Sequence, residues 1–198
     1  MISGIEKFYC KSRLHAYIWR YLANKLLPAL IPYFPSSPFV LEIGTGQGLG
    51  AIFLAEKLKY SRFIAIDYER DMVETAIWNV NNRGLQDRIR VEWGDAVSLN
   101  FQESSFDAVV SITVLHHVPG YEKAIFEAAR VLKRGGFFMI VDLDFKASIF
   151  PRFDVLIGGA VSTVSWEQVS LALQNAGFDV LKIERYGMGM FASVAVKL

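Results

Sequence analysis

The chain has one cysteine, three histidines and no excess of either charge, and each of these scarcities excludes a class of protein. Cys10 alone forms no internal disulfide and no cysteine-rich zinc site, which indicates a reducing compartment, and we expect the cytoplasm. A formal net charge of +1 creates no overall field for nucleic acid or for an anionic membrane. Nucleic acid is therefore not an expected partner.

Long hydrophobic runs are also missing, although 53% of the 198 residues are hydrophobic. Asp, Arg or Gly interrupts each apolar run well before the roughly 20 residues that span a bilayer, so we expect no membrane span. Residues 1–33 are basic and poor in acids, which is typical of a transit peptide, but their many aromatic residues favour a packed helix. The chain length suits one main domain.

Apolar residues recur at every fourth position from Leu14 to Leu26, which predicts an amphipathic helix. Four prolines between Pro28 and Pro38 then predict an irregular linker. We therefore expect an N-terminal helical lid with a proline-rich linker over residues 1–38 and the main domain over residues 39–198.

From Phe39 onward, short apolar runs alternate with longer amphipathic ones, a rhythm typical of βαβ units with helices on both faces of a sheet. The final two runs are separated by Gly187 and Gly189 and predict a hairpin. The fold class is thus α/β, a doubly wound, mostly parallel sheet of seven strands with an antiparallel C-terminal hairpin. Expected strands are 39–43, 62–66, 89–93, 106–112, 136–143, 178–184 and 191–198, and expected helices are 49–58, 70–82, 121–132 and 166–176.

A glycine-rich turn follows the first expected strand, in the sequence Val40-Leu41-Glu42-Ile43-Gly44-Thr45-Gly46-Gln47-Gly48. Glycines there let the backbone approach a ligand, and the next helix directs free N–H groups at an anion. Dinucleotide-binding proteins carry G-x-G-x-x-G at the same place, but Leu49 occupies the last position of that template. The spacing therefore disfavours NAD(P), as does the lack of a Tyr-x-x-x-Lys pair.

Polar residues also follow the next three expected strands. Asp67 ends the second strand, Asp95 follows the third, and the fourth runs through Ser111 into a Leu-His-His segment, residues 115–117. The carboxyl ends of parallel strands meet at one edge of a sheet, so these groups define a crevice at a topological switch point. A carboxylate such as Asp67 can accept both hydroxyls of a ribose.

Together these segments resemble the class I S-adenosylmethionine-dependent methyltransferases, a Rossmann-like family, and in particular the methyltransferase type 11 group. The resemblance covers residues 39–144 in order and the C-terminal hairpin loosely. It implies S-adenosylmethionine as the cofactor, with its methionine end on the glycine turn and on Ser111, its ammonium near Glu42, its ribose on Asp67 and its adenine near Tyr68, Met72 and Asp95. The implied cofactor-binding residues are Glu42, Gly44, Thr45, Gly46, Gly48, Asp67, Tyr68, Met72, Asp95, Ala96 and Ser111. We expect Trp93 in the core.

His116 and His117 leave three hypotheses open: a proton-accepting or acceptor-orienting catalytic role, a metal site and simple packing. A metal site needs more converging ligands, and the remaining histidine, His15, lies in the N-terminal segment. We therefore expect no bound metal. Methyl transfer often needs no base, because alignment of the nucleophile with the methyl group already lowers the barrier.

The sequence thus predicts a methyltransferase that acts on a small, apolar or aromatic acceptor, as a monomer or homodimer. Aromatic residues gather in the N-terminal segment and in an expected acceptor-side insertion over residues 145–165, and we expect these two pieces to enclose the acceptor. Two alternatives remain: a catalytically silent S-adenosylmethionine-binding partner subunit, and an RNA or protein methyltransferase. A base-amino methyltransferase would favour an Asn/Asp-Pro-Pro-aromatic tetrad where this chain has residues 111–114.

Overall fold

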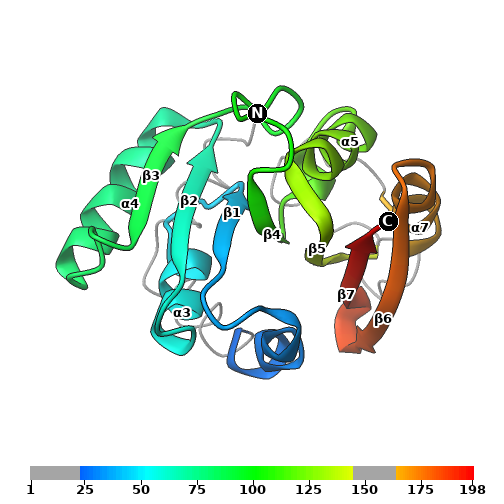
Figure 1. Ribbon diagram of the computed structural model, residues 1–198, viewed down its shortest axis with the longest axis horizontal. Helices are drawn as coiled ribbons and strands as arrows, with labels where there is room; N and C mark the ends of the chain where they lie inside the picture. Colours follow the sequence, from blue (N-terminus) through cyan, green and yellow to red (C-terminus); the bar gives the residue numbers. More distant parts are fainter. Residues whose placement is uncertain (1–22, 145–163) are drawn as a thin grey trace.

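The computed structural model describes residues 23–144 and 164–198, in which one seven-stranded sheet lies between two layers of helices (Figure 1). Parallel strands β1 to β5 are followed by an antiparallel pair, as the sequence predicts. The strands are β1 Phe39–Ile43, β2 Arg62–Asp67, β3 Ile89–Trp93, β4 Phe106–Ile112, β5 Leu132–Leu143, β6 Phe178–Tyr186 and β7 Met190–Lys197. The α-helices are α3 Leu49–Lys57, α4 Arg70–Asn82, α5 Tyr121–Val131 and α7 Trp166–Asn175, and the 3-10 turns are η1 Leu27–Ala29, η2 Ile31–Tyr33, η3 Leu115–His117 and η4 Gly187–Gly189.

The strand order is β3-β2-β1-β4-β5-β7-β6, so β1, the first strand of the sheet along the chain, lies inside the sheet between β2 and β4. From β1 the chain builds outward through β2 to β3 and then returns to add β4 on the other side of β1. The connections on the two sides of β1 therefore diverge at its carboxyl end. This reversal of direction opens a crevice there, where open α/β sheets bind their ligands.

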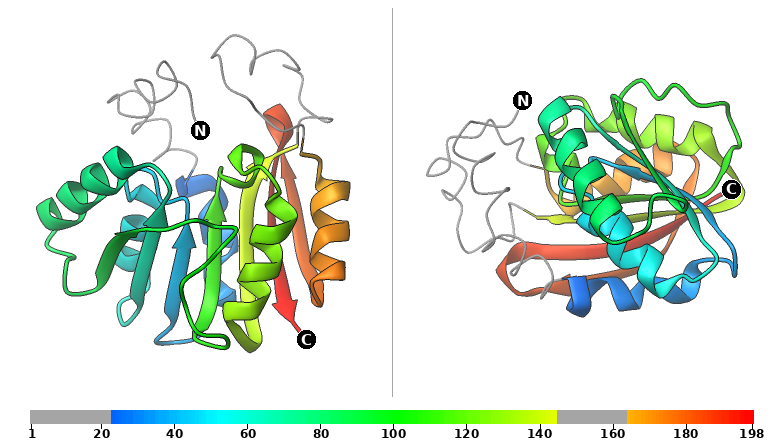
Figure 2. Two further views of the ribbon diagram at one scale, coloured as in Figure 1. Left: turned by 90° about the horizontal axis from the view of Figure 1, so that it is seen from above. Right: turned by 90° about the vertical axis from the view of Figure 1, so that its left-hand side faces the viewer.

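Both faces of β1, β4 and β7 are largely buried, which explains why these strands read as continuous apolar runs, whereas the edge strands β3 and β6 are partly exposed. One core lies between the sheet and η1, α3 and part of α4, and the other lies between the sheet and α5 and α7 (Figure 2). In β1, Val40 belongs to the first core and Leu41 to the second, and neither is exposed. Within the described ranges, no helix is long and apolar enough to cross a membrane.

The proline-rich segment differs from the expected irregular linker. Pro28 and Pro32 lie in the first turns of η1 and η2, where a residue without an N–H group is tolerated. Leu26, Leu27 and Leu30 are buried against the sheet. Residues 23–34 thus pack on the sheet through one apolar side, and the prolines shape the turns of this segment.

Two other expectations meet the structure only in part. Of the predicted helix over residues 14–26, the described part is helical at residues 23–26, and the rest lies outside the described residues. Most of the expected insertion, residues 145–163, also lies outside them. Strand β5 begins at Leu132, four residues earlier than predicted, because Leu132 pairs with Phe106 of β4 across an irregularity in the register.

Candidate functional site

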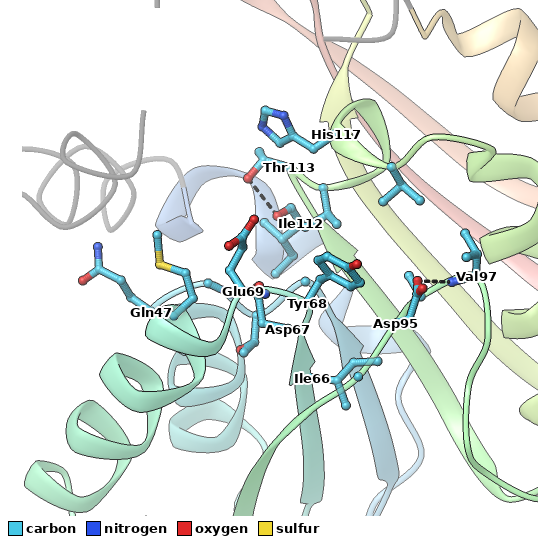
Figure 3. Close-up of a pocket in the computed structure, with 18 of the residues that line it drawn as sticks. Gln47, Ile66, Asp67, Tyr68, Glu69, Asp95, Val97, Ile112, Thr113 and His117 are labelled. Atoms are coloured by element: carbon cyan, nitrogen blue, oxygen red, sulfur yellow. Dashed lines mark hydrogen bonds between the residues drawn. The ribbon is translucent and has the colours of Figure 1, made fainter. Parts of the chain in front are cut away.

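A cavity of about 450 Å³ opens at the carboxyl ends of the central strands (Figure 3). The strand register sets its position: Ile43 pairs with both Ile66 and Ser111, so the turns that follow β1, β2 and β4 begin at the same level. The residues that line it are Gly44, Thr45, Gly46, Gln47, Leu49, Ile66, Asp67, Tyr68, Glu69, Met72, Gly94, Asp95, Ala96, Val97, Ile112, Thr113, Val114, His117, Val118 and Pro119.

The glycine turn forms one wall of this cavity. Gly44 has a φ of +67°, in the left-handed region, and a Cβ atom there would overlap the side chain of Val114. The Thr45 N–H donates to the Ile66 carbonyl oxygen at 2.8 Å, which joins the turn to the end of β2. Only glycine at position 44 lets the turn pass this close to the segment after β4.

Asp67 lies at the end of β2 and lines the cavity, as the sequence predicts. Its Oδ2 accepts the Gly46 N–H at 2.7 Å, and its Oδ1 accepts the Glu69 N–H at 2.9 Å. Burial raises the pKa of the Asp67 carboxyl, while these two backbone hydrogen bonds oppose the rise. Each oxygen keeps a second lone pair, so the carboxylate can still accept a hydroxyl from a ligand.

Beyond Asp67, an aromatic side chain and a second carboxylate continue the cavity. The side chain of Tyr68 is 55% exposed, and Asp95 accepts the Val97 N–H at 3.0 Å through its Oδ1. Met72 also lines the cavity and is otherwise buried. The described structure thus brings Tyr68, Met72, Asp95 and Ala96 together around one space.

Trp93 does not lie in the core, so that expectation is wrong. Its side chain is 48% exposed, because β3 is an edge strand with a neighbour on one side only. The Trp93 indole N–H donates to the Tyr68 carbonyl oxygen at 2.8 Å, and the Arg70 guanidinium lies 5.3 Å from the indole ring centroid. Trp93 therefore braces the backbone that carries Tyr68.

Three of the expected cofactor-binding residues lie outside the cavity lining: Glu42, Gly48 and Ser111. Glu42 is buried beneath the glycine turn, where it accepts the Thr45 hydroxyl and, at 3.1 Å, the Ala51 N–H. A Cβ atom at Gly50 would overlap the Glu42 carboxyl. Burial raises the pKa of Glu42 to about 7. In this structure Glu42 supports the turn, and its contact with a ligand ammonium stays a prediction.

The two histidines occupy different places. His117 lines the cavity, whereas His116 is buried behind it and contacts the Asp142 carboxylate through Nδ1. The two ring centroids lie 3.9 Å apart. In the part of the chain that the structure describes, no three His, Cys, Asp or Glu side chains gather in a way that could hold a metal ion.

Sequence reasoning missed part of the cavity wall. Thr113 lines the cavity with a φ of +55°, a conformation that is uncommon for a residue other than glycine. Its N–H donates to the Val141 carbonyl oxygen at 2.7 Å, which ties the end of β4 to β5. Its position directly after an apolar strand was a usable signal. The other missed lining residues are Gln47, Leu49, Ile66, Glu69, Gly94, Val97, Ile112, Val114, Val118 and Pro119.

The sequence of this chain is similar to those of known methyltransferases. A family model described as "Methyltransferase domain" matches residues 41–140. The fatty-acid O-methyltransferase of Mycolicibacterium smegmatis is 33% identical over 116 residues, which are 59% of this chain and 39% of that protein. The demethylmenaquinone methyltransferase of Bacteroides fragilis is 29% identical over 125 residues, 63% of this chain and 49% of that protein. This chain therefore spans about half or less of the length of these relatives.

A solved structure has the same fold over nearly the whole chain. The PH0226 protein from Pyrococcus horikoshii OT3 matches with a TM-score of 0.80 and 22% identity, covering 96% of this chain and 93% of that one. The family match itself runs from β1 into β5 and so contains the glycine turn, Asp67, Asp95 and the segment after β4. On this evidence the chain belongs to the methyltransferase domain family of the class I S-adenosylmethionine-dependent methyltransferases.

Proposed function

We propose that this chain binds S-adenosylmethionine in the cavity at the carboxyl edge of its sheet and methylates a small acceptor. The observation that carries the proposal is the convergence, on one cavity of about 450 Å³, of the glycine turn after β1 and the carboxylates after β2 and β3. When bound, the cofactor supplies an activated methyl group on its sulfonium. The chain's own residues then have to bind, orient and exclude water.

The residues present fit a ligand that has an amino-acid end and a nucleoside end. Gly46 lines the cavity, and no heavy atom lies within 4 Å of an added Cβ atom there, so a ligand can approach the backbone of the glycine turn. Asp67 lines the cavity with lone pairs that can accept ribose hydroxyls, and the exposed Tyr68 ring offers a face for a base. We assign the base to the side of Tyr68, Met72 and Asp95.

The acceptor is proposed to be small and apolar or aromatic. Apolar side chains dominate the wall that follows β4, where Ile112, Val114, Val118 and Pro119 line the cavity. Such a wall favours apolar ligands and keeps water from the reacting atoms. The names of the two curated relatives, which refer to a fatty acid and to demethylmenaquinone, support the same class.

Calorimetry with S-adenosylhomocysteine tests the binding half of the proposal. We expect Asp67→Ala to weaken binding by about 1.5 to 3 kcal/mol, roughly ten- to a hundred-fold, which is the usual value of charge-assisted hydrogen bonds. Asp87→Ala is the matched control, because Asp87 is an exposed carboxylate before the amino end of β3 and does not line the cavity. Equal affinity in wild type and Asp67→Ala, or tighter binding of NADH, would remove the basis of the proposal.

Turnover tests the catalytic half. The protein is incubated with S-adenosylmethionine and a panel of fatty acids, quinols, phenols and total RNA, and both methylated products and S-adenosylhomocysteine are measured. We expect product from an apolar hydroxyl- or carboxyl-bearing compound. Normal cofactor binding with no product from any acceptor favours the catalytically silent partner subunit, and methylated RNA as the main product contradicts the proposed acceptor class.

The proposal that the N-terminal helix and residues 145–165 enclose the acceptor is tested by deletion. The deletion ends at residue 22, because Ala23, Leu26 and Leu27 are buried in the core and their removal would unfold the domain. We expect the shortened protein to lose methyl transfer while its cofactor affinity stays within about tenfold. Full turnover by the folded, shortened protein contradicts the enclosure.

A further inference from the structure

Two residues of the cavity wall depart from the local structure that their positions favour. Thr113 has a φ of +55°, a region that a β-branched side chain strongly disfavours. Glu69 is the N-cap residue of α4, where Ser, Thr, Asp or Asn usually caps the first turn, but its side chain makes no cap hydrogen bond. Both residues line the cavity. Such departures reduce stability and occur at functional sites, so they indicate a function for both side chains.

The fold holds Thr113 with its hydroxyl oxygen available as an acceptor. The Thr113 N–H donates to the Val141 carbonyl oxygen at 2.7 Å, and the Thr113 hydroxyl donates to the Ile112 carbonyl oxygen at 2.7 Å. The hydroxyl hydrogen is thus engaged, while the oxygen keeps its lone pairs. A ligand group that meets this oxygen in the cavity therefore has to donate a hydrogen bond.

Glu69 reaches the cavity from the opposite wall. Its N–H donates to Asp67 Oδ1 at 2.9 Å, which fixes the backbone at the start of α4. Figure 3 shows the Glu69 carboxylate pointing from this helix into the cavity, toward the side on which Thr113 and His117 lie. An ionised carboxylate accepts hydrogen bonds and donates none. Both walls thus present acceptor oxygens to a ligand.

The described lining offers no positive charge to a ligand at neutral pH. It contains no lysine and no arginine. Burial, assisted by the neighbouring His116, lowers the pKa of His117 to about 3, so this ring is uncharged at neutral pH. An acceptor carboxylate near Glu69 would meet repulsion that no described cation offsets. A hydroxyl or amino group would instead donate to the oxygens of Glu69 and Thr113.

We propose that Glu69 and Thr113 form a polar subsite that binds a hydrogen-bond donor of the acceptor, a hydroxyl or an amine, and that rejects acceptor carboxylates. The inference rests on the proposed function and narrows its acceptor class. The apolar side chains of Ile112, Val114 and Val118 line the same cavity and contact the rest of the acceptor. The two oxygens orient the group that is to be methylated, since a donor has to satisfy both of them.

The first test is calorimetry on the S-adenosylhomocysteine complex of the full chain, with 4-hexylphenol and 4-hexylbenzoate as probes of similar shape. At neutral pH the phenol is uncharged and the benzoate is an anion. We expect the phenol to bind the wild type at least about tenfold more tightly than the benzoate. Glu69→Gln removes the charge with little change of shape, and it should tighten benzoate binding about tenfold while S-adenosylhomocysteine affinity stays within about threefold.

Glu74→Gln is the matched control, because Glu74 is exposed on α4 and does not line the cavity. It should change the affinity of neither probe. Equal binding of the two probes to the wild type, or no binding of the phenol, overturns the polar subsite. Failure of the wild type to bind S-adenosylhomocysteine contradicts the proposed function instead.

The second test separates recognition from a structural role. Glu69→Ser supplies the missing cap and should raise Tm by roughly 2 to 4 °C. Thr113→Gly relieves the backbone strain and should not lower Tm. Both variants should weaken phenol binding about tenfold. Ser104→Gly is the control for strain, because Ser104 has a φ of +56° outside the cavity lining, and it should leave phenol binding unchanged. Unchanged phenol binding in Glu69→Ser and Thr113→Gly shows that the proposal is wrong, whatever their stability.

Discussion

Glu42 is a residue whose ionisation opposes folding, because its carboxyl is buried beneath the glycine turn. Burial raises its pKa from 4.5 to about 7, so the folded protein binds this proton more tightly than the unfolded chain. The stabilisation from that proton is complete below about pH 4.5 and is lost as the pH rises through about 7. We expect wild type to lose roughly 3 kcal/mol relative to Glu42→Gln between pH 4.5 and pH 8.

Urea unfolding of wild type and Glu42→Gln at both ends of this pH range measures that difference. Glu56→Gln is the control, because the Glu56 side chain is 44% exposed in a surface ion pair with Arg83. The comparison between variants removes the opposing pH dependence of other groups, His117 included. A constant difference between wild type and Glu42→Gln at every pH would show that Glu42 ionises normally.

Alanine substitutions at Gly44 and Gly46 distinguish the cost of backbone strain from the cost of steric overlap. Gly46 has a φ of +53° with nothing within 4 Å of an added Cβ atom, so Gly46→Ala should cost only the left-handed backbone, about 1 to 2 kcal/mol. Gly44 has a φ of +67°, and its added Cβ atom overlaps Val114. Gly44→Ala should therefore cost about 1 to 3 kcal/mol more than Gly46→Ala.

Denaturant unfolding of the two glycine variants gives the comparison directly. Adding Val114→Ala to Gly44→Ala should recover part of the loss, because it removes the overlapping methyl groups and leaves the backbone strain. Equal destabilisation by Gly44→Ala and Gly46→Ala is the outcome that contradicts the close approach of the turn to Val114.

Among the elements, α7 begins with a complete capping box. The Gln168 N–H donates to Ser165 Oγ at 3.4 Å, and the Ser165 N–H donates to Gln168 Oε1 at 3.0 Å. Ser165 is fully buried, so removal of its hydroxyl leaves an N–H group without a partner. We expect Ser165→Ala to lower the free energy of unfolding by about 1 kcal/mol or more.

Ser170 provides the matched control within the same helix. It lies inside α7, where alanine is the better helix former, so Ser170→Ala should leave stability unchanged or slightly higher. Both variants are compared by urea unfolding at one pH. If the two serine-to-alanine changes have the same effect, the cap does not contribute to stability.

At the scale of the whole molecule, the cavity lies at the edge of the same sheet that carries a core on each face. A ligand that binds only the folded protein therefore stabilises the whole domain. S-adenosylhomocysteine at a hundred times its Kd should stabilise the protein by about 2.7 kcal/mol. For a chain of this size, that raises Tm by roughly 5 to 10 °C. Differential scanning fluorimetry measures the shift, and EDTA should not change it. A shift that disappears with EDTA and returns with zinc would indicate a metal that sequence reasoning did not expect.

Much of the fold could be predicted because the signal is local. The predicted bounds of α4, β1, β3 and β4 agree with the structure, since apolar periodicity and the glycines and prolines between the runs are properties of neighbouring residues. The positions of Asp67 and Asp95 at the cavity were equally predictable, because parallel strands that end in sequence also end at one edge of the sheet.

What the sequence could not give depends on residues far apart in the chain. Trp93 was expected in the core because it is apolar, and only the edge position of β3 exposes it. The role of Glu42 at the ligand ammonium is implied by the family resemblance and stays a prediction, and the structure adds that Glu42 accepts the Thr45 hydroxyl and the Ala51 N–H beneath the turn. The local sequence pattern predicts where strands, helices and turns lie, whereas tertiary packing decides whether a given side chain is exposed, buried or at the cavity.

The sequence by itself thus determined the order of the elements, the glycine turn and the carboxylates that follow the strands. Only the tertiary structure decided that Asp142 meets His116 across 26 positions of the chain and that His117 alone of the pair reaches the cavity. The reason is physical: the contact requires η3 to fold back against the end of β5, and no short-range pattern records which side chains of two separate segments meet.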